Sequence, residues 1–302
     1  MALEKGIAEL VEEFIAAGRP SSRQQSITQR REGYIASAVL AGETETRVDI
    51  QTIELEGMTL RIVSPLNAPT LLPTIIYYYG GCFVSGGFAT HDNQLRQLAY
   101  YGQCRIIAVQ YRLAPEHTFP AAHDDAQRGA ELVRQHAERL GVDKQRITLA
   151  GDSAGGHLAL VTALRLKRAG EWQPAQLILI YPMLDATAHF ESYIRNGHDY
   201  IITRDTLLSG FGMYLPGIER RHPEASPIWR NDFNGLPPVH IITAEYDPLC
   251  DEGEALYHRM TGQGVQCTCQ RYLGVIHGFF QLGGISEAAR SALRDVAWRA
   301  GR

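Results

Sequence analysis

Short runs of β-branched and aromatic residues recur along most of the chain and predict β-strands. The inner runs are almost wholly apolar, such as TIIYYY at 74–79 and LILIY at 177–181, as expected of strands buried on both faces of a sheet. Only Glu56 and Gly57 separate the first two runs, which predicts a β-hairpin. The predicted strands are 47–55, 58–64, 73–79, 105–111, 146–150, 176–181, 239–245 and 266–272.

Apolar residues at helical spacing fill most of the stretches between the later strands. From residue 73 onward, strands therefore alternate with helices, which predicts an α/β fold with a mostly parallel sheet and helices on both faces. Residues 20–32 are polar and show no strong pattern of their own. The predicted helices are 4–17, 121–140, 154–169, 251–263 and 284–299.

The segment 185–225 interrupts this alternation. Aromatic and charged residues stand there in mixed order, between the strand ending at Tyr181 and the strand beginning at Val239. Because the connection is too long for a plain crossover, we expect an insertion over one end of the sheet. It is either a lid over a binding site or a decorative helical addition.

The composition excludes several classes of protein. Apolar residues make up 45% and charged residues 21% of the chain, as in globular proteins rather than disordered ones or coiled coils. A net charge of -4 offers no basic field for nucleic acid. Prolines and glycines divide the uncharged stretch 62–91 into pieces too short to span a membrane, and acidic residues in the N-terminal apolar pattern do not fit a signal peptide.

The five cysteines form no pair of CxxC motifs of the zinc-binding kind. An odd and sparse set predicts reduced thiols rather than a disulfide framework, and hence a cytoplasmic protein. These residues are Cys82, Cys104, Cys250, Cys267 and Cys269.

Residues 151–155 read Gly-Asp-Ser-Ala-Gly, a G-x-S-x-G pentapeptide between a predicted strand and a predicted helix. A tight turn in this setting lifts the serine hydroxyl above the sheet, and the glycines let neighbouring backbone pass closely. The helix that follows offers free N–H groups to a developing anionic oxygen. We therefore predict that Ser153 is a nucleophile and that Asp152 anchors the turn.

A serine hydroxyl needs a base to take its proton and a third group to orient that base. Asp247 and His277 each follow a predicted strand, in the chain order Ser, acid, His that such sheets use. Glu245 and Asp251 are rival acids, but Glu245 is expected within the strand and Asp251 at a helix start. The predicted triad is thus Ser153, Asp247 and His277.

The Gly-rich loop that follows the strand 73–79 is well placed to supply donors for an oxyanion, together with the N–H group of Ala154. His157 also follows the nucleophile closely, but it lies inside the predicted helix. We expect His157 to have a packing role.

Five segments resemble the hormone-sensitive-lipase-like group of α/β-hydrolase esterases, in family order and at family spacing. Together they span residues 77–280, and two of them, YRLAPEHTFP and DPLCDEGE, are far more specific than G-x-S-x-G. The segments are YYYGGCFVSGG (77–87), YRLAPEHTFPAAHDDA (111–126), GDSAGG (151–156), ITAEYDPLCDEGE (242–254) and VIHGFF (275–280).

The resemblance implies an α/β-hydrolase fold with an eight-stranded core. It also implies cap helices in residues 1–45, a catalytic domain in residues 46–302 and a cap insertion at about 185–225. The same residues carry the triad Ser153, Asp247 and His277. The implied oxyanion donors are the N–H groups of Gly81, Cys82 and Ala154, and the predicted substrate-binding residues are Tyr79, Phe83 and Asp152.

The oxyanion loop departs from the family's usual His-Gly-Gly-Gly, because here it reads Tyr79-Gly80-Gly81-Cys82. Backbone donors do not depend on the side chain, so we expect the loop to remain competent, with Cys82 narrowing the pocket beside the attacked carbonyl. A positive φ at Cys82 would store about 1–3 kcal/mol of strain.

The predicted function is a serine carboxylesterase that acts on small esters with acyl chains of about two to eight carbons. It needs no metal and no organic cofactor. An amidase, or a lactone or carbamate hydrolase, would use the same triad, whereas a non-catalytic receptor on this fold usually lacks the histidine. The strand 266–272 is expected at the sheet edge, where strand pairing would give a homodimer.

Overall fold

A computed structural model describes residues 2–18 and 23–302. Within them lies an eight-stranded sheet with the strand order β1-β2-β4-β3-β5-β6-β7-β8. The pairs β1–β2 and β2–β4 are antiparallel and the other five are parallel, which confirms the predicted α/β sheet. The strands are β1 Val48–Leu55, β2 Met58–Pro65, β3 Leu72–Tyr78, β4 Arg105–Val109, β5 Val142–Asp152, β6 Gln176–Ile180, β7 Val239–Tyr246 and β8 Cys267–Ile276.

The edge strands of the sheet are less buried than its central strands. β1 is buried only at its end residues, Val48 and Leu55. It joins β2 through Glu56 and Gly57, both at positive φ, as a two-residue hairpin turn requires. β3 is buried along its whole length. β8 lies at the far edge, as predicted, and Gly274 near its end accepts a hydrogen bond from the N–H group of Glu4.

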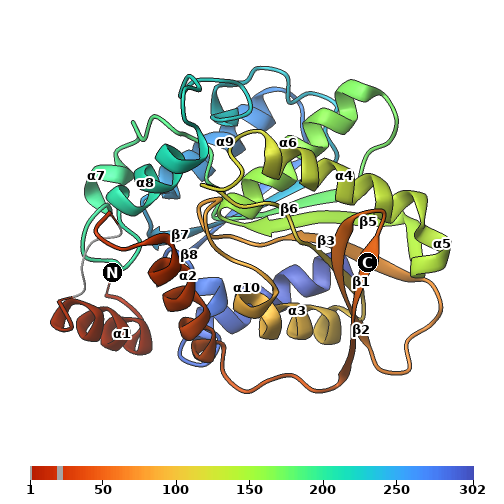
Figure 1. Cartoon of the computed structure of the whole chain (residues 1–302), viewed down its shortest axis with the longest axis horizontal. Helices are drawn as coiled ribbons and strands as arrows, with labels where there is room; N and C mark the ends of the chain where they lie inside the picture. The colour runs from red at the N-terminus through yellow and green to blue at the C-terminus, as the bar shows by residue number, and fades with distance from the viewer. Residues whose placement is uncertain (1, 19–22) are drawn as a thin grey trace.

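Helices cover both faces of the sheet (Figure 1). α3 (Phe88–Gly102) and α10 (Glu287–Ala300) lie together on one face, and α4 (Ala121–Gln135), α6 (Ala154–Ala169) and α9 (Cys250–Gly262) cover the other. The predicted helix 121–140 is divided at His136, where the short α5 (Ala137–Leu140) begins. None of the described helices is long and apolar enough to cross a bilayer.

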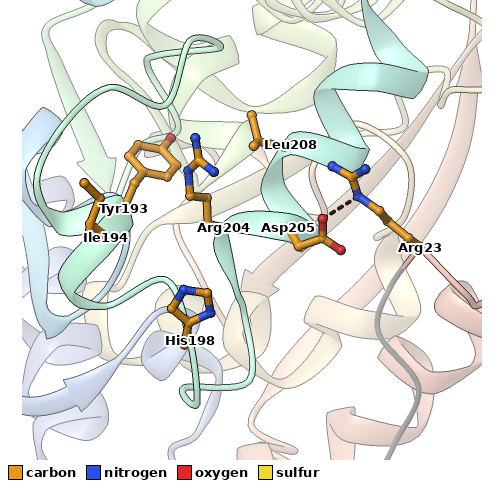
Figure 2. Close-up of a pocket in the computed structure, with 7 residues that line it drawn as sticks. All are labelled: Arg23, Tyr193, Ile194, His198, Arg204, Asp205 and Leu208. Carbon is orange, nitrogen blue, oxygen red and sulfur yellow. Dashed lines mark ion pairs between the residues drawn. The ribbon is translucent and has the colours of Figure 1, made fainter.

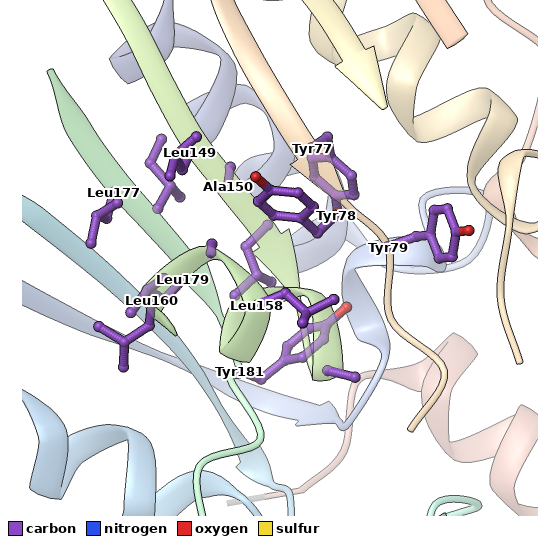
Figure 3. Packing of buried hydrophobic residues seen from close by; sticks show 14 of the residues in the cluster. Tyr77, Tyr78, Tyr79, Leu149, Ala150, Leu158, Leu160, Leu177, Leu179 and Tyr181 are labelled. Carbon is purple, nitrogen blue, oxygen red and sulfur yellow. The ribbon is translucent and has the colours of Figure 1, made fainter. Parts of the chain in front are cut away.

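The core between the sheet and α6 is built from aromatic and branched side chains (Figure 3). Tyr78 of β3, Leu149 of β5 and Leu179 of β6 are fully buried there, together with Leu158 of α6, whereas Tyr77 of β3 points to the opposite face, toward His91 of α3. The almost wholly apolar runs of the sequence therefore form the central strands, as the pattern predicted.

Outside the insertion, two helices were not identified from the apolar pattern, although one of them lies among the cap helices that the resemblance implied in residues 1–45. α2 (Ile27–Ala36) begins at Ser26, whose side chain forms a capping box with Gln29, but none of its residues is fully buried. α3 buries the polar residues His91, Asn93 and Gln94 beside its apolar ones. In both helices the apolar periodicity that identifies an amphipathic helix is therefore weak.

Four short segments gather at one end of the sheet (Figure 1). The N-terminal helices α1 (Lys5–Ala16) and α2 lie beside α7 (Ser192–Arg195) and α8 (Arg204–Tyr214), which belong to the predicted insertion. Arg23 forms an ion pair with Asp205 of α8, and Arg30 of α2 donates to the Ser209 hydroxyl. Three short 3₁₀ turns complete the chain: η1 Ser37–Ala41, η2 Pro227–Trp229 and η3 Phe279–Gln281.

Candidate active site

Ser153 occupies the single position between the end of β5 and the start of α6, with φ 55° and ψ -118°. A Cβ atom on Gly155 would lie 1.8 Å from the carbonyl oxygen of Tyr78. α6 therefore approaches β3 so closely that only glycine fits there. The N–H group of Ser153 donates to the Ile180 carbonyl at 2.8 Å, which fixes the turn against β6.

The structure brings the three predicted triad residues together. His277 Nε2 lies 3.0 Å from Ser153 Oγ, and His277 Nδ1 lies 2.8 Å from Asp247 Oδ2. All three side chains are buried. Because the carboxylate of Asp247 can only accept, His277 Nδ1 carries a proton and Nε2 is left to accept one from Ser153.

The rival acids are engaged elsewhere. Glu245 Oε2 accepts the Gly274 N–H at 2.8 Å. Asp251 lies in the first turn of α9 and accepts the N–H of Ser192. Because His277 Nδ1 lies 2.8 Å from Asp247 Oδ2, the geometry favours Asp247 as the partner of that histidine.

Three residues that the sequence did not single out hold the loop around Asp247. The Asn196 amide donates to the carbonyl oxygens of both Glu245 and Asp247 at 3.1 Å. The Ser192 hydroxyl donates to the Pro248 carbonyl at 2.6 Å. The third, Glu252, is fully buried and accepts the Leu184 N–H.

The surroundings of Glu252 shift its pKa. Burial raises its pKa well above the ordinary value, and the neighbouring carboxyl groups of Asp185 and Asp247 raise it further. These surroundings therefore favour the protonated form of Glu252 over a second buried anion next to Asp247.

The proposed oxyanion loop has the conformation that the family's glycines suggest. φ is 131° at Gly81, 55° at Cys82 and 64° at Phe83, so Cys82 lies in the left-handed region and carries the anticipated strain. The N–H groups of Gly81 and Cys82 have no recorded acceptor within residues 2–18 and 23–302. Ala154 is the first residue of α6, where an N–H group has no partner inside the helix.

The Cys82 side chain lies between this loop and α8. A Cβ atom on Gly210 of α8 would lie 2.6 Å from Cys82 Cβ. The loop therefore contacts α8 at this point. Burial raises the pKa of the Cys82 thiol to about 11, and the thiol is therefore neutral near pH 7.

A cavity of about 520 Å³ lies directly over Ser153. Its floor includes Gly81, Cys82, Asp152, Ser153 and His277. Much of its wall comes from two segments, the N-terminal one and the insertion, and the lining is mainly apolar. The wall residues from the N-terminal segment include Leu10, Phe14, Arg30, Tyr34 and Leu40, and those from the insertion are Ile201, Ile202 and Thr206.

Two of the predicted substrate-binding residues do not line this cavity. Tyr79 is buried and stacks on Tyr111, with ring centroids 4.5 Å apart. Phe83 is buried and stacks on Tyr214 of α8 at 4.4 Å. The positive φ at Phe83 turns its ring into the interior. Both side chains therefore support the loop from behind, and nothing in their placement supports a contact with substrate.

Asp152 does line the cavity, but its carboxylate is occupied. Oδ1 accepts hydrogen bonds from the Tyr77 hydroxyl at 2.9 Å and from the Gly80 N–H at 3.0 Å, and it lies 3.1 Å from His91 Nε2. Burial alone would raise its pKa, but the charge of His91 and these hydrogen bonds hold the pKa below its ordinary value. Asp152 is therefore an anion that anchors the loop.

A second cavity of about 430 Å³ lies between α7 and α8 (Figure 2). It contains none of the predicted site residues. Its lining residues are Arg23, Tyr193, Ile194, His198, Arg204, Asp205 and Leu208. Among the described residues, no group of three or more His, Cys, Asp or Glu side chains is arranged to hold a metal ion.

Comparisons with known proteins show the family to which the chain belongs. A family model described as an alpha/beta hydrolase fold matches residues 75–281. Carboxylesterase NlhH of Mycobacterium tuberculosis is 33% identical over 255 residues, covering 82% of this chain and 80% of that protein. Ethyl acetate hydrolase of Pseudomonas putida is 33% identical over 296 residues, covering 94% and 93%.

A solved structure is similar along the whole chain. The esterase of the archaeon Pyrobaculum calidifontis has a TM-score of 0.91 and 37% sequence identity to this chain. The match covers all of this chain and 98% of the archaeal one. The similarity therefore includes both the sheet and the helices that line the cavity.

Proposed function

The chain belongs to the α/β-hydrolase family, in its hormone-sensitive-lipase-like group, and is a carboxylic ester hydrolase. From that premise we propose that it cleaves short-chain esters through an acyl-enzyme intermediate on Ser153. One observation supports this mechanism above all others. Asp247, His277 and Ser153 form an uninterrupted hydrogen-bonded series, with distances of 2.8 and 3.0 Å, at the floor of a cavity.

In the first half-reaction, Ser153 Oγ attacks the ester carbonyl carbon while His277 Nε2 takes its proton. Asp247 holds the imidazole in the working tautomer and stabilises the imidazolium that forms. The carbonyl oxygen becomes an anion and accepts hydrogen bonds from the N–H groups of Gly81, Cys82 and Ala154. His277 then gives its proton to the alcohol oxygen, which leaves as the carbon–oxygen bond breaks.

In the second half-reaction, a water molecule replaces the alcohol. His277 Nε2 takes a proton from the water as its oxygen attacks the acyl carbon on Ser153. The tetrahedral adduct collapses, His277 returns the proton to Ser153 Oγ, and the carboxylic acid is released.

The size and walls of the cavity favour small esters. A volume of about 520 Å³ lies within the range of roughly 300–1,000 Å³ typical of small-molecule sites. The N-terminal segment and the insertion at about 185–225 act as a cap, because side chains from both line the cavity over Ser153. An acyl chain of about two to eight carbons fits such a space, and Cys82 narrows it beside the attacked carbonyl.

The test is hydrolysis of p-nitrophenyl acetate, butyrate, octanoate and palmitate by the wild-type protein and by Ser153→Ala. We expect activity on the shorter esters that disappears in the variant, with unchanged circular dichroism and melting temperature. A p-nitroanilide with the best acyl group serves as the matched amide, and we expect its cleavage to be much slower. Equal rates on ester and anilide, or activity that survives in Ser153→Ala, would contradict the proposal.

A further inference from the structure

A second buried histidine–aspartate pair lies beside the nucleophile. His91 of α3 and Asp152, the residue before Ser153, approach to 3.1 Å between Nε2 and Oδ1. Both side chains are almost completely buried. Neither group is recorded in contact with Ser153 Oγ, and the proposed mechanism uses neither to move a proton.

Asp152 connects this pair to the oxyanion loop. Its Oδ1 accepts the N–H of Gly80, the residue that precedes the proposed donor Gly81. A Cβ atom on Gly80 would lie 2.4 Å from Asp152 Oδ2, so the carboxylate packs directly against the start of the loop. The next three residues have positive φ, a conformation that persists only where the surroundings hold it.

His91 is itself held in one orientation. Thr90 Oγ1 lies 2.8 Å from the Gly87 carbonyl oxygen and also 2.8 Å from His91 Nδ1. Because the Asp152 carboxylate can only accept, His91 Nε2 carries the proton that faces it. Both ring nitrogens of His91 thus face protein groups, Nδ1 facing Thr90 and Nε2 facing Asp152, and neither is available to a substrate.

The same histidine also contacts the wall of the substrate cavity. His91 Nε2 lies 3.1 Å from the Gln281 amide nitrogen. Gln281 Oε1 accepts from the Tyr34 hydroxyl of α2 at 2.7 Å, and both Gln281 and Tyr34 line the cavity. A continuous series of contacts thus runs from the cap helix α2 to Gly80.

We propose that His91 is a positioning residue for the oxyanion loop: it holds Asp152 where that carboxylate fixes the Gly80 N–H, and Gln281 and Tyr34 join this support to the cap. This role presupposes the ester hydrolysis proposed above. Loss of His91 removes one of the three donors that face the buried Asp152 carboxylate, so that the carboxylate and the loop relax together.

The expected loss falls on the transition state rather than on substrate binding. The oxyanion exists only after attack, so a misplaced Gly81 or Cys82 N–H weakens the interaction made at that stage. Removing a whole oxyanion donor costs on the order of 10²–10³ in kcat. For displacement of the loop in His91→Phe we expect a fall of about 10–100-fold in kcat with KM changed less than about threefold.

The experiment compares His91→Phe with a matched control elsewhere in the sheet. His240 of β7 is also buried, with Nδ1 2.8 Å from Thr268 Oγ1 and Nε2 3.1 Å from Asp295 Oδ2. His240→Phe therefore makes the same chemical change far from the loop. We expect both variants to lose thermal stability, but only His91→Phe to lose kcat.

A tetrahedral adduct supplies a readout that a purely structural role would not move. Alkyl trifluoromethyl ketones add to the active serine and place an oxyanion in the donor site. The Ki of these ketones should rise in His91→Phe by the same factor as kcat/KM falls. His91→Gln restores an N–H near the position of Nε2, so its Ki and its kcat/KM should both lie closer to the wild-type values. In His240→Phe the Ki should stay at the wild-type value.

Unchanged kcat and Ki in a folded His91→Phe would overturn the positioning role, and so would a raised KM with unchanged kcat. If His91→Phe does not fold, His91→Gln and Gln281→Met are measured in the same way, with a smaller loss of kcat expected for each. A folded wild-type protein without any esterase activity would instead refute the proposed function.

Discussion

His277 and His91 each contact a buried aspartate beside the turn at Ser153, but the two aspartates contact opposite nitrogens. Asp247 binds His277 at Nδ1, and this leaves Nε2 facing the serine hydroxyl at 3.0 Å. Asp152 faces His91 at Nε2, while Nδ1 is bound to Thr90. The same two residue types therefore suit proton transfer in one place and support of the backbone in the other.

The surroundings of the two aspartates differ as well. The buried carboxyl group of Glu252, whose pKa is raised, lies near Asp247, and Asn196 holds the Asp247 loop. Asp152 is surrounded by donors, with Tyr77 and Gly80 beside His91. In the proposed mechanism Asp247 stabilises the positive charge that forms on His277 during proton transfer, whereas Asp152 anchors the loop and moves no proton.

The largest effect should follow from Asp247→Asn. An amide in this position can stabilise the wrong tautomer of His277 and cannot stabilise the imidazolium, so we expect kcat to fall about 10⁴-fold with little change in KM. Steady-state kinetics on p-nitrophenyl butyrate measure this loss, and circular dichroism checks the fold. A loss below tenfold would mean that another group orients His277.

Asp152→Asn should have a smaller effect, which sharpens the comparison. The amide keeps the size of the side chain but weakens acceptance from Gly80 N–H and removes the charge partner of His91. We expect kcat to fall about 10–100-fold, with the pH dependence of kcat/KM unchanged because Asp152 does not orient the base. A loss as large as that of Asp247→Asn would erase the distinction between the two pairs.

Much of the first pair could be predicted from sequence, and almost none of the second. Asp247 and His277 each follow a strand, and the carboxyl ends of parallel strands meet at one edge of the sheet. His91 lies within α3, whose buried face is partly polar, so neither the helix nor its histidine stood out from the pattern. The contact of Asn196 with Asp247 joins separate loops and depends on how the insertion packs.

The side chains of the oxyanion loop were the least predictable feature of the site. Tyr79 and Phe83 flank the loop in sequence, but the backbone at Cys82 and Phe83 takes a positive φ, which non-glycine residues rarely adopt. This conformation places the Phe83 ring among the interior aromatic residues. The order of residue types along the chain does not predict this backbone conformation.

Glu252→Gln should change how stability depends on pH. The folded-state pKa of Glu252 is raised, so its contribution to stability is complete below the pKa of about 4.3 in the unfolded chain and declines as pH rises toward the folded value. Between these two pKa values the free energy of unfolding of the wild-type protein should fall by about 1.4 kcal/mol per pH unit relative to that of the glutamine variant. Urea unfolding of both proteins from pH 5 to 8 measures the difference, and parallel stability curves would show that Glu252 is ionised in the folded state.

Cys82→Gly should have the smallest effect on rate, because it alters the cavity side of the loop and leaves its anchor intact. Glycine adopts φ near 55° without strain, so we expect a gain of about 1 kcal/mol in the free energy of unfolding, offset in part by glycine's greater freedom in the unfolded chain. The space freed beside the carbonyl should shift the preference toward longer acyl chains by about threefold. Hydrolysis of the p-nitrophenyl series and urea unfolding measure the two effects. An unchanged chain-length profile would show that Cys82 does not narrow the pocket, and a loss of kcat comparable to that of Asp152→Asn would show that the cavity side of the loop also sets its position.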